Sequence, residues 1–226
     1  MKKIFFFSLL AISTISLAQE TKTKEKEGKS SIYFGGGFVS NSKFAIDDKL
    51  EAVNLPQIQA NVPEFVVGFN TFFNKGFLDI EASSNMFKKS NSATTSNGGR
   101  SNFRLRGHYN MVNNKDFVFS GGLNLAFTSN DINVYSQTNQ VDINNLTVTT
   151  SNYLRLRNNM FFAGPSIGFG IKNKGEQLIR INVGYEFALI SGKWKSDYAT
   201  VSNSIKENGQ SRLMVGAVFF FNNHSK

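Results

Sequence analysis

Apolar and polar residues alternate with a period of two in eight separate runs along this chain. In each run, bulky apolar side chains occupy every second position, while glycine, small polar or charged side chains occupy the positions between them. This alternation is typical of β-strands whose two faces meet different surroundings. The eight runs lie at residues 31–39, 64–73, 76–86, 102–112, 117–127, 161–171, 178–190 and 212–221.

The connections between these runs alternate in length. Short polar turns follow the even-numbered runs, at residues 74–75, 113–116 and 172–175. Longer polar segments follow the odd-numbered runs, at residues 40–63, 88–99, 129–152 and 192–210. Each run is close to the roughly 9–11 residues that a tilted strand needs to cross a bilayer. The sequence therefore predicts an all-β fold, an eight-stranded antiparallel up-and-down transmembrane β-barrel over residues 31–221.

The first residues resemble an export signal. Lys2 and Lys3 precede a mostly apolar stretch at residues 4–15, and the small residues Ser16 and Ala18 follow it. We expect residues 1–18 to be a signal peptide, because the apolar stretch is too short for a spanning helix. Residues 19–30, rich in charge, are expected to form a flexible periplasmic leader. The even strand count places both termini on the short-turn side, with residues 222–226 as a periplasmic tail.

Composition narrows the chemistry. The chain has no cysteine and two histidines, so neither a disulfide framework nor a transition-metal site is expected, and no cofactor is predicted. The formal charge of +9 falls to +7 once Lys2 and Lys3 are removed with the signal peptide. In an exported protein this excess indicates an anionic lipid surface rather than nucleic acid.

Aromatic side chains collect where the short turns meet the strands. Phe73, Phe77, Phe117 and Phe221 all lie at these ends. We expect them to form an interfacial girdle, as aromatic residues do at membrane boundaries. A soluble barrel would instead need the apolar face inside, where so many phenylalanines would crowd a narrow core.

The rhythm of strands and loops over residues 31–221 resembles the small outer-membrane barrels of the OmpA/OmpX type, and more particularly the PorT-like outer membrane protein beta-barrel families. The last run, LMVGAVFFF at 213–221, resembles the signal read by the barrel-assembly machinery. The resemblance implies the outer membrane of a Gram-negative bacterium, and it allows a role in protein secretion.

Charged residues at inward-facing positions are the one group of side chains that suggests a chemical role. They would meet inside the barrel, because eight strands leave an interior that side chains can fill. They are expected to pair across the barrel and to be flanked by inward glycines at positions 35, 37, 68, 122, 168 and 216. The predicted interior network consists of Asp79, Glu81, Arg104, Arg106, His108, Arg180, Glu186 and Arg212.

Three roles are open to this network. It can close the barrel as a salt-bridge plug, or it can form a gated polar path through a narrow pore. A catalytic role would use His108 beside Asp79 and Glu81, but no serine or cysteine motif accompanies that imidazole.

The long connections are rich in Asn, Ser and Thr and are expected to carry any contact function. In the third, residues 132–135 and 146–149 alternate and predict a protruding hairpin whose edge can pair with another protein. In the first, residues 47–53 predict one helical turn, and Asp47 and Asp48 are expected to be solvated. Lipopolysaccharide contact at the outer interface is predicted for Arg155, Arg157, Lys193, Trp194 and Lys195.

These observations predict a monomeric, non-enzymatic outer-membrane barrel with a structural or surface-interaction role. Its partners would be outer-membrane lipid, lipopolysaccharide and an extracellular or envelope protein that contacts the long loops. The alternatives are a narrow pore for ions or small solutes and a component of a secretion machinery.

Overall fold

A computed structural model describes residues 29–73, 75–137, 153–197, 199–202 and 204–221. The predicted signal peptide, nearly all of the leader, the C-terminal tail and residues 146–149 of the third connection lie outside the described residues.

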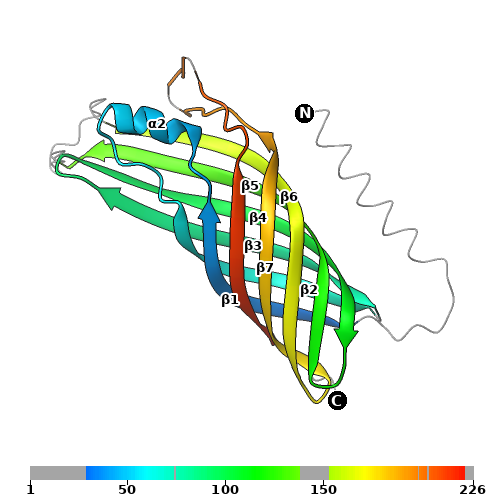
Figure 1. The fold of residues 1–226 in the computed structure, drawn as a ribbon. Helices are drawn as coiled ribbons and strands as arrows, with labels where there is room; N and C mark the ends of the chain where they lie inside the picture. Colours follow the sequence, from blue (N-terminus) through cyan, green and yellow to red (C-terminus); the bar gives the residue numbers. More distant parts are fainter. Residues whose placement is uncertain (1–28, 74, 138–152, 198, 203, 222–226) are drawn as a thin grey trace.

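Eight antiparallel strands form a closed barrel in which each strand pairs with its neighbours in sequence and β1 closes on β8 (Figure 1). The predicted fold class is confirmed. The strands are β1 (Ser30–Asn41), β2 (Asn61–Phe73), β3 (Gly76–Ser90), β4 (Thr94–Asn113), β5 (Phe117–Ser136), β6 (Tyr153–Asn173), β7 (Glu176–Ser191) and β8 (Ser211–Phe221).

The short turns lie together at one end of the barrel, as the spacing predicts. Between β6 and β7, Lys174 and Gly175 both have positive φ, at 52° and 83°. Two residues in this region form the tight hairpin turn that matches the twist of the flanking strands. Asn114 shapes the β4–β5 turn, where its side-chain oxygen accepts from the backbone N–H of Asp116 and Phe117 at 2.9 and 2.8 Å.

The other end is uneven, because β3 to β6 continue past their neighbours. The expected loop at residues 88–99 is mostly strand: β3 runs to Ser90, β4 begins at Thr94, and residues 91–93 join them. Here the prediction of a long loop was wrong, because serine, threonine and asparagine can pair across strands as well as turn the chain. Residues 132–135 belong to β5 and pair with β6 through Tyr135 and Tyr153.

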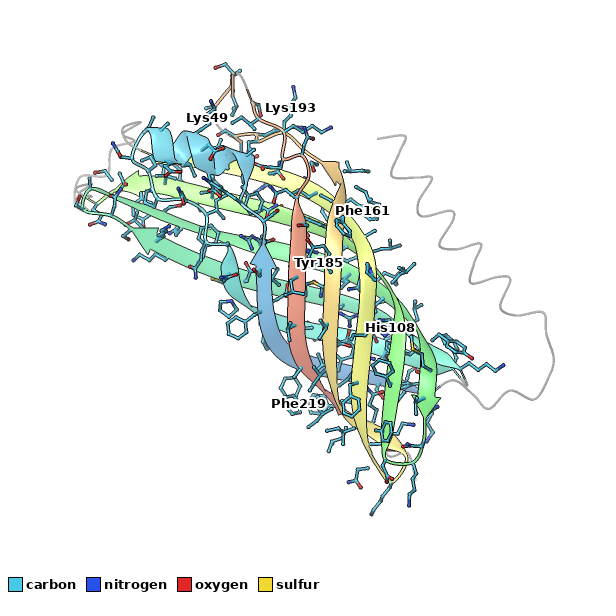
Figure 2. All side chains as sticks on the ribbon, viewed as in Figure 1. Lys49, His108, Phe161, Tyr185, Lys193 and Phe219 are labelled. Atoms are coloured by element: carbon cyan, nitrogen blue, oxygen red, sulfur yellow. The ribbon has the colours of Figure 1, made fainter. Side chains whose placement is uncertain are left out.

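Outward-facing apolar side chains form a belt around the barrel, and polar side chains fill its inside. On β5 the outward-facing residues are apolar from Phe117 to Phe127, and the next one, Ser129, is polar. This stretch is roughly 33 Å along the strand at about 3.3 Å per residue, hence about 25 Å in height at a tilt near 40°. That height matches the hydrocarbon layer of an outer membrane. In Figure 2, Phe219 lies at the short-turn end of this belt and Phe161 nearer the other end.

One member of the predicted aromatic girdle is misplaced. Phe73, Phe117 and Phe221 face outward, but Phe77 is only 3% exposed and points into the barrel. The alternation of β3 explains this position, since Leu78 faces outward and its neighbour must face inward.

The first connection carries the one helix among the described residues, α2 (Ala45–Ala52), which is longer than the single turn expected. Figure 1 shows α2 lying across the end of the barrel opposite the short turns. No helix in the described parts of the chain is long and apolar enough to span a bilayer.

The belt yields a prediction about depth. Leu123 faces outward near the middle of the belt, and Leu123→Arg should destabilise the folded protein in lipid by about 2–4 kcal/mol. Met86 also faces outward but lies beyond Ser84, where the outward side of β3 turns polar. Met86→Arg should therefore change the free energy of unfolding little. Urea unfolding in lipid vesicles measures both, and equal losses would contradict this placement of the belt.

Candidate functional site

The barrel interior contains a continuous chain of alternating charges, which we call the charge network. Arg180 contacts Asp79, and Asp79 accepts from Arg106 at 3.0 Å. Arg106 reaches Glu81 at 3.3 Å, and Glu81 contacts Arg104. All these side chains are buried.

The network continues away from the short turns through a second pair of acidic residues. Arg104 lies 3.3 Å from Glu186 and 3.8 Å from Glu64, and Glu186 contacts Arg212 at 2.6 Å. Glu64 was missed in the sequence, although its parity on β2 points inward. With Glu64 included, four guanidinium groups face four carboxylates, so the formal charges of the network cancel. A buried charge without such compensation would be strongly unfavourable.

His108 lies beside the network but contacts no carboxylate within the described residues. Its Nδ1 is 3.0 Å from the Ser120 hydroxyl, and its Nε2 is 2.6 Å from the Ser166 hydroxyl. Sequence reasoning placed no serine there, because the two serines come from β5 and β6 and no local motif joins them. Ser166 donates in turn to Asn124 at 2.8 Å, so the imidazole is held in a neutral polar layer. Figure 2 shows His108 toward the short-turn end.

Aromatic rings close the short-turn end of the interior around Arg180. The guanidinium carbon lies 4.2 Å from the ring centre of Phe77, 5.0 Å from Phe220 and 5.6 Å from Tyr33. Such cation–π contacts stabilise the desolvated guanidinium through its two flat faces, which carry no N–H group for a hydrogen bond. The Tyr33 hydroxyl also donates to Glu81 at 3.1 Å, which joins this aromatic floor to the charge network.

Inward glycines make room for different neighbours: the backbone of an adjacent strand at Gly35 and Gly37, and side chains that include Arg180 at Gly168. A Cβ atom at Gly68 would collide with the Tyr33 ring, and one at Gly122 would collide with the β4 backbone and lie 2.7 Å from the imidazole of His108. One interior cavity, beside Glu81, Arg104 and Arg106, measures about 30 Å³, which is about twice the 10–15 Å³ that one buried water needs.

The end of the barrel opposite the short turns is covered by a packed apolar cap (Figure 1), which we define as α2 with residues 42–60 and the described part of 192–210. Phe44, Ile46 and Leu50 from the first connection and Trp194 from the fourth are buried in one cluster. This cluster also includes inward residues of the extended strands, namely Phe87, Ile132, Val134, Leu156, Met160 and Phe162. The sequence indicated polar contact loops here and did not predict this packing.

Glu207 joins the two connections of the cap. Its carboxylate accepts from the backbone N–H of Ala45 at 2.6 Å and of Ile46 at 3.1 Å, at the N-terminus of α2. The indole N–H of Trp194 donates to the same carboxylate at 2.6 Å. An acidic group at this position satisfies free N–H groups and favours the helix dipole. No sequence signal pointed to Glu207, because its partners at the start of α2 are about 160 residues away.

Asp47 has a similar structural role and is buried, which corrects the expectation that it is solvated. Its carboxylate accepts from the backbone N–H of Phe44 at 3.1 Å and of Ile58 at 2.8 Å. Burial raises the pKa of the Asp47 carboxyl above its usual range, and the two N–H donors only partly offset this effect. Its neighbour Asp48 is exposed and pairs with Lys43 at 2.7 Å.

The predicted lipopolysaccharide residues separate into two groups. Trp194 is 1% exposed and inside the cap, so it is not available to a lipid and its assignment was wrong. Lys193 and Lys195 are exposed on either side of it. Arg155 pairs with Asp131 at 3.0 Å, and Arg157 lies 3.5 Å from the same carboxylate. Within the described residues, no group of three or more potential metal ligands comes together.

Comparisons with known proteins support the fold. No protein-family model matches the chain, and no curated protein matches its sequence. Among solved structures, Ail, the attachment invasion locus protein of Yersinia pestis, matches with a TM-score of 0.50 and 13% identity, over 87% of this chain and 100% of that one.

Two Pseudomonas aeruginosa proteins also match. The N-terminal β-barrel domain of OprF gives a TM-score of 0.43 and 9% identity, over 86% of this chain and 100% of that one. The outer membrane protein OprG gives 0.44 and 12%, over 87% and 98%. The match to Ail shows the same fold, so the resemblance noted in the sequence is confirmed for the fold.

The charge network yields a prediction about coupling. Arg212→Met should leave Glu186 buried with only Arg104 beside it, at a cost of about 3–5 kcal/mol. Replacing Glu186 and Arg212 together by leucine and methionine should cost clearly less than the two single changes added. Unfolding in detergent with urea measures all three variants, and strictly additive losses would show that the two charges do not depend on each other.

The cap yields a separate prediction. Glu207→Gln removes an acceptor from the start of α2 and should favour local opening of the cap by about 1–3 kcal/mol. Trp194 is the only tryptophan, so its emission should shift to the red, and the amides of Ala45 and Ile46 should exchange faster with deuterium. The matched control is Glu51→Gln on the exposed side of α2. If both variants behave alike, Glu207 does not hold the cap.

Proposed function

We propose that this protein is an integral outer-membrane protein with a non-enzymatic role, either structural or in contacts at the cell surface. The apolar belt supports insertion in a membrane, because its calculated height suits the hydrocarbon layer. Both termini would lie on the periplasmic side with the short turns. The uneven end of the barrel, with its cap and extended strands, would then face outward.

The observation that best supports a closed barrel interior is the unbroken chain of contacts from Arg180 to Arg212. It supports a plug, because Arg180 on β7 contacts Asp79 on β3, and Arg104 on β4 lies 3.3 Å from Glu186 on β7. These contacts join non-adjacent strands, and a continuous water column would separate them. The aromatic floor below and the cap above add two further barriers. A narrow pore would require rearrangement at all three levels.

Contacts at the surface would involve the groups that remain accessible at the outer end. Lys193, Lys195, Arg155 and Arg157 lie just beyond the apolar belt and suit the phosphates of lipopolysaccharide. The extended strands β3 to β6 offer a surface to an extracellular or envelope protein. We propose a monomer, since the closed barrel leaves no unpaired strand edge within the belt.

Location and shape can be tested together. The protein should fractionate with outer membranes and should run faster on a gel when it is not heated in detergent, because a closed barrel stays compact until it is boiled. Cysteine introduced at exposed Lys49 on α2 should react with an impermeant reagent on intact cells. Cysteine at Lys115, in a short turn, should react only after lysis. The reverse labelling pattern would contradict the proposed orientation.

Conductance tests the closed interior. The unmodified protein should give no steady ion current in planar bilayers, because the contacts of Arg180 with Asp79 and of Arg104 with Glu186 would interrupt a water column. Arg106→Ala with Arg180→Ala should give only small, irregular currents, since the cap and the pairs around Glu186 stay in place. Stable, ion-selective conductance from the unmodified protein would favour the pore over the plug.

A further inference from the structure

We propose that the open edge of β3, beyond the apolar belt, binds an acidic, extended segment of an extracellular protein as an added strand. This edge consists of Met86, Lys88 and Ser90, and we call it the β3 edge. A partner and a binding mode at this edge deepen the surface role proposed above, and they rest on that role. Figure 1 shows β3 extending at the end of the barrel that carries α2.

The pairing of β3 with β2 ends before β3 itself does. The last pair joins Phe65 with Ser84, whereas pairing with β4 continues as far as Ser90. Beyond that last pair, β2 continues to Asn61 in contact with β1 alone. The final part of β3 therefore has a strand on one side only. Such an edge presents unpaired backbone groups to an approaching chain.

A proline explains why the β2–β3 ladder stops. Continuing its register by two residues places Pro63 opposite Met86. On β2 the odd-numbered residues bond toward β3, because even-numbered Phe72 bonds the other way and donates its N–H to Lys29 O at 2.8 Å. Pro63 has no N–H, so it cannot donate to the carbonyl of Met86. The sequence thus leaves this edge open.

The hydrogen bonds at the two ends of β3 identify which backbone groups are free. Asn91 N donates to Thr94 O at 3.0 Å, and Asn110 N donates to Lys75 O at 2.8 Å, so odd-numbered residues bond toward β4. In an antiparallel sheet, alternate residues of a strand bond to opposite neighbours. The N–H and C=O groups of the even-numbered β3 edge therefore point away from β4, toward the open side.

The chain between α2 and β2 leaves this edge uncovered. Ile58 belongs to the buried cluster of the cap, and Gln59 O accepts from an inward arginine of β4 at 2.9 Å. This segment therefore lies over the inner face of the sheet. Its contact with the tip of β3, from Asn91 Nδ2 to Asn54 O at 2.8 Å, is past the end of the edge. On the outer face Met86 is 81% exposed.

Charge selects the partner. Lys88 and Lys89 are exposed, and neither has an acidic partner among the described residues. Antiparallel pairing of two copies over the whole edge would place Lys88 opposite Lys88 of the second copy, where like charges repel. Lysine on an open edge opposes self-association in this way. An acidic residue opposite Lys88 reverses the effect, so the edge fits an extended segment with Asp or Glu there and an apolar residue opposite Met86.

Amide exchange tests the mode of binding. The full mature chain in detergent is mixed with the labelled peptide Ser-Thr-Thr-Thr-Glu-Thr-Leu-Thr-Ser, whose Glu and Leu can lie opposite Lys88 and Met86. In the free protein the amides of Met86 and Lys88 should exchange fast, and those of Phe87 and Lys89 slowly, because only the latter bond to β4. The peptide should slow exchange at Met86 and Lys88. This alternation distinguishes strand addition from contact with the outer face.

Fluorescence anisotropy of the peptide tests the charge. We expect saturable binding that is about fivefold tighter than that of a peptide with Lys in place of Glu. Lys88→Glu should reverse the preference. The matched control is Lys49→Glu on the exposed side of α2, which should keep it.

Three results would overturn this assignment: no saturable binding, equal affinity for the two peptides, or slowed exchange without the alternation. Concentration-dependent pairing of two copies through this edge would also overturn it, because the occupant would then be a second copy. Binding in detergent does not depend on the location of the protein in the cell. Fractionation and labelling of intact cells test that location separately, so failure of the β3 edge stays distinct from failure of the proposed surface role.

Discussion

Closure of β1 onto β8 is the interaction on which the rest of this molecule depends. In hydrocarbon an unpaired backbone amide costs several kcal/mol, so the sheet must end on itself. Ten residue pairs, from Ile32 with Phe221 to Asn41 with Arg212, complete the circle. Once eight strands close, the width of the interior is set, and inward side chains from opposite walls come within contact distance.

The balance of charges in the interior follows from that width. Long arginine side chains from β4, β7 and β8 meet carboxylates from β2, β3 and β7, and each guanidinium in the network has an acidic neighbour. A low dielectric makes such pairs strong and unpaired members very unfavourable. The same pairing that stabilises the wall leaves little space for water, so stability and closure have one physical cause in the proposed plug.

The cap adds a second, independent core outside the membrane. Its apolar cluster combines two connections far apart in sequence with the extended parts of β3 to β6. Glu207 and Asp47 satisfy the start of α2 and the neighbouring backbone, so polar groups that would be exposed in a loose loop are bonded here. Burial of Trp194 in the cap leaves Lys193 and Lys195 exposed on either side of it.

The alternation of side chains determined the strand count, their order, the faces of the wall and the inward position of residues such as Arg104 and Glu186, because a period of two is a local property of the chain. The structure of the long connections could not be predicted from this alternation. Polar residues at 88–99 are compatible with a loop and with strands, and only pairing with β5 decided for strands. The position of Trp194, the role of Glu207 and the two serines on His108 were likewise decided by the tertiary structure, since their partners come from distant segments that only barrel closure brings together.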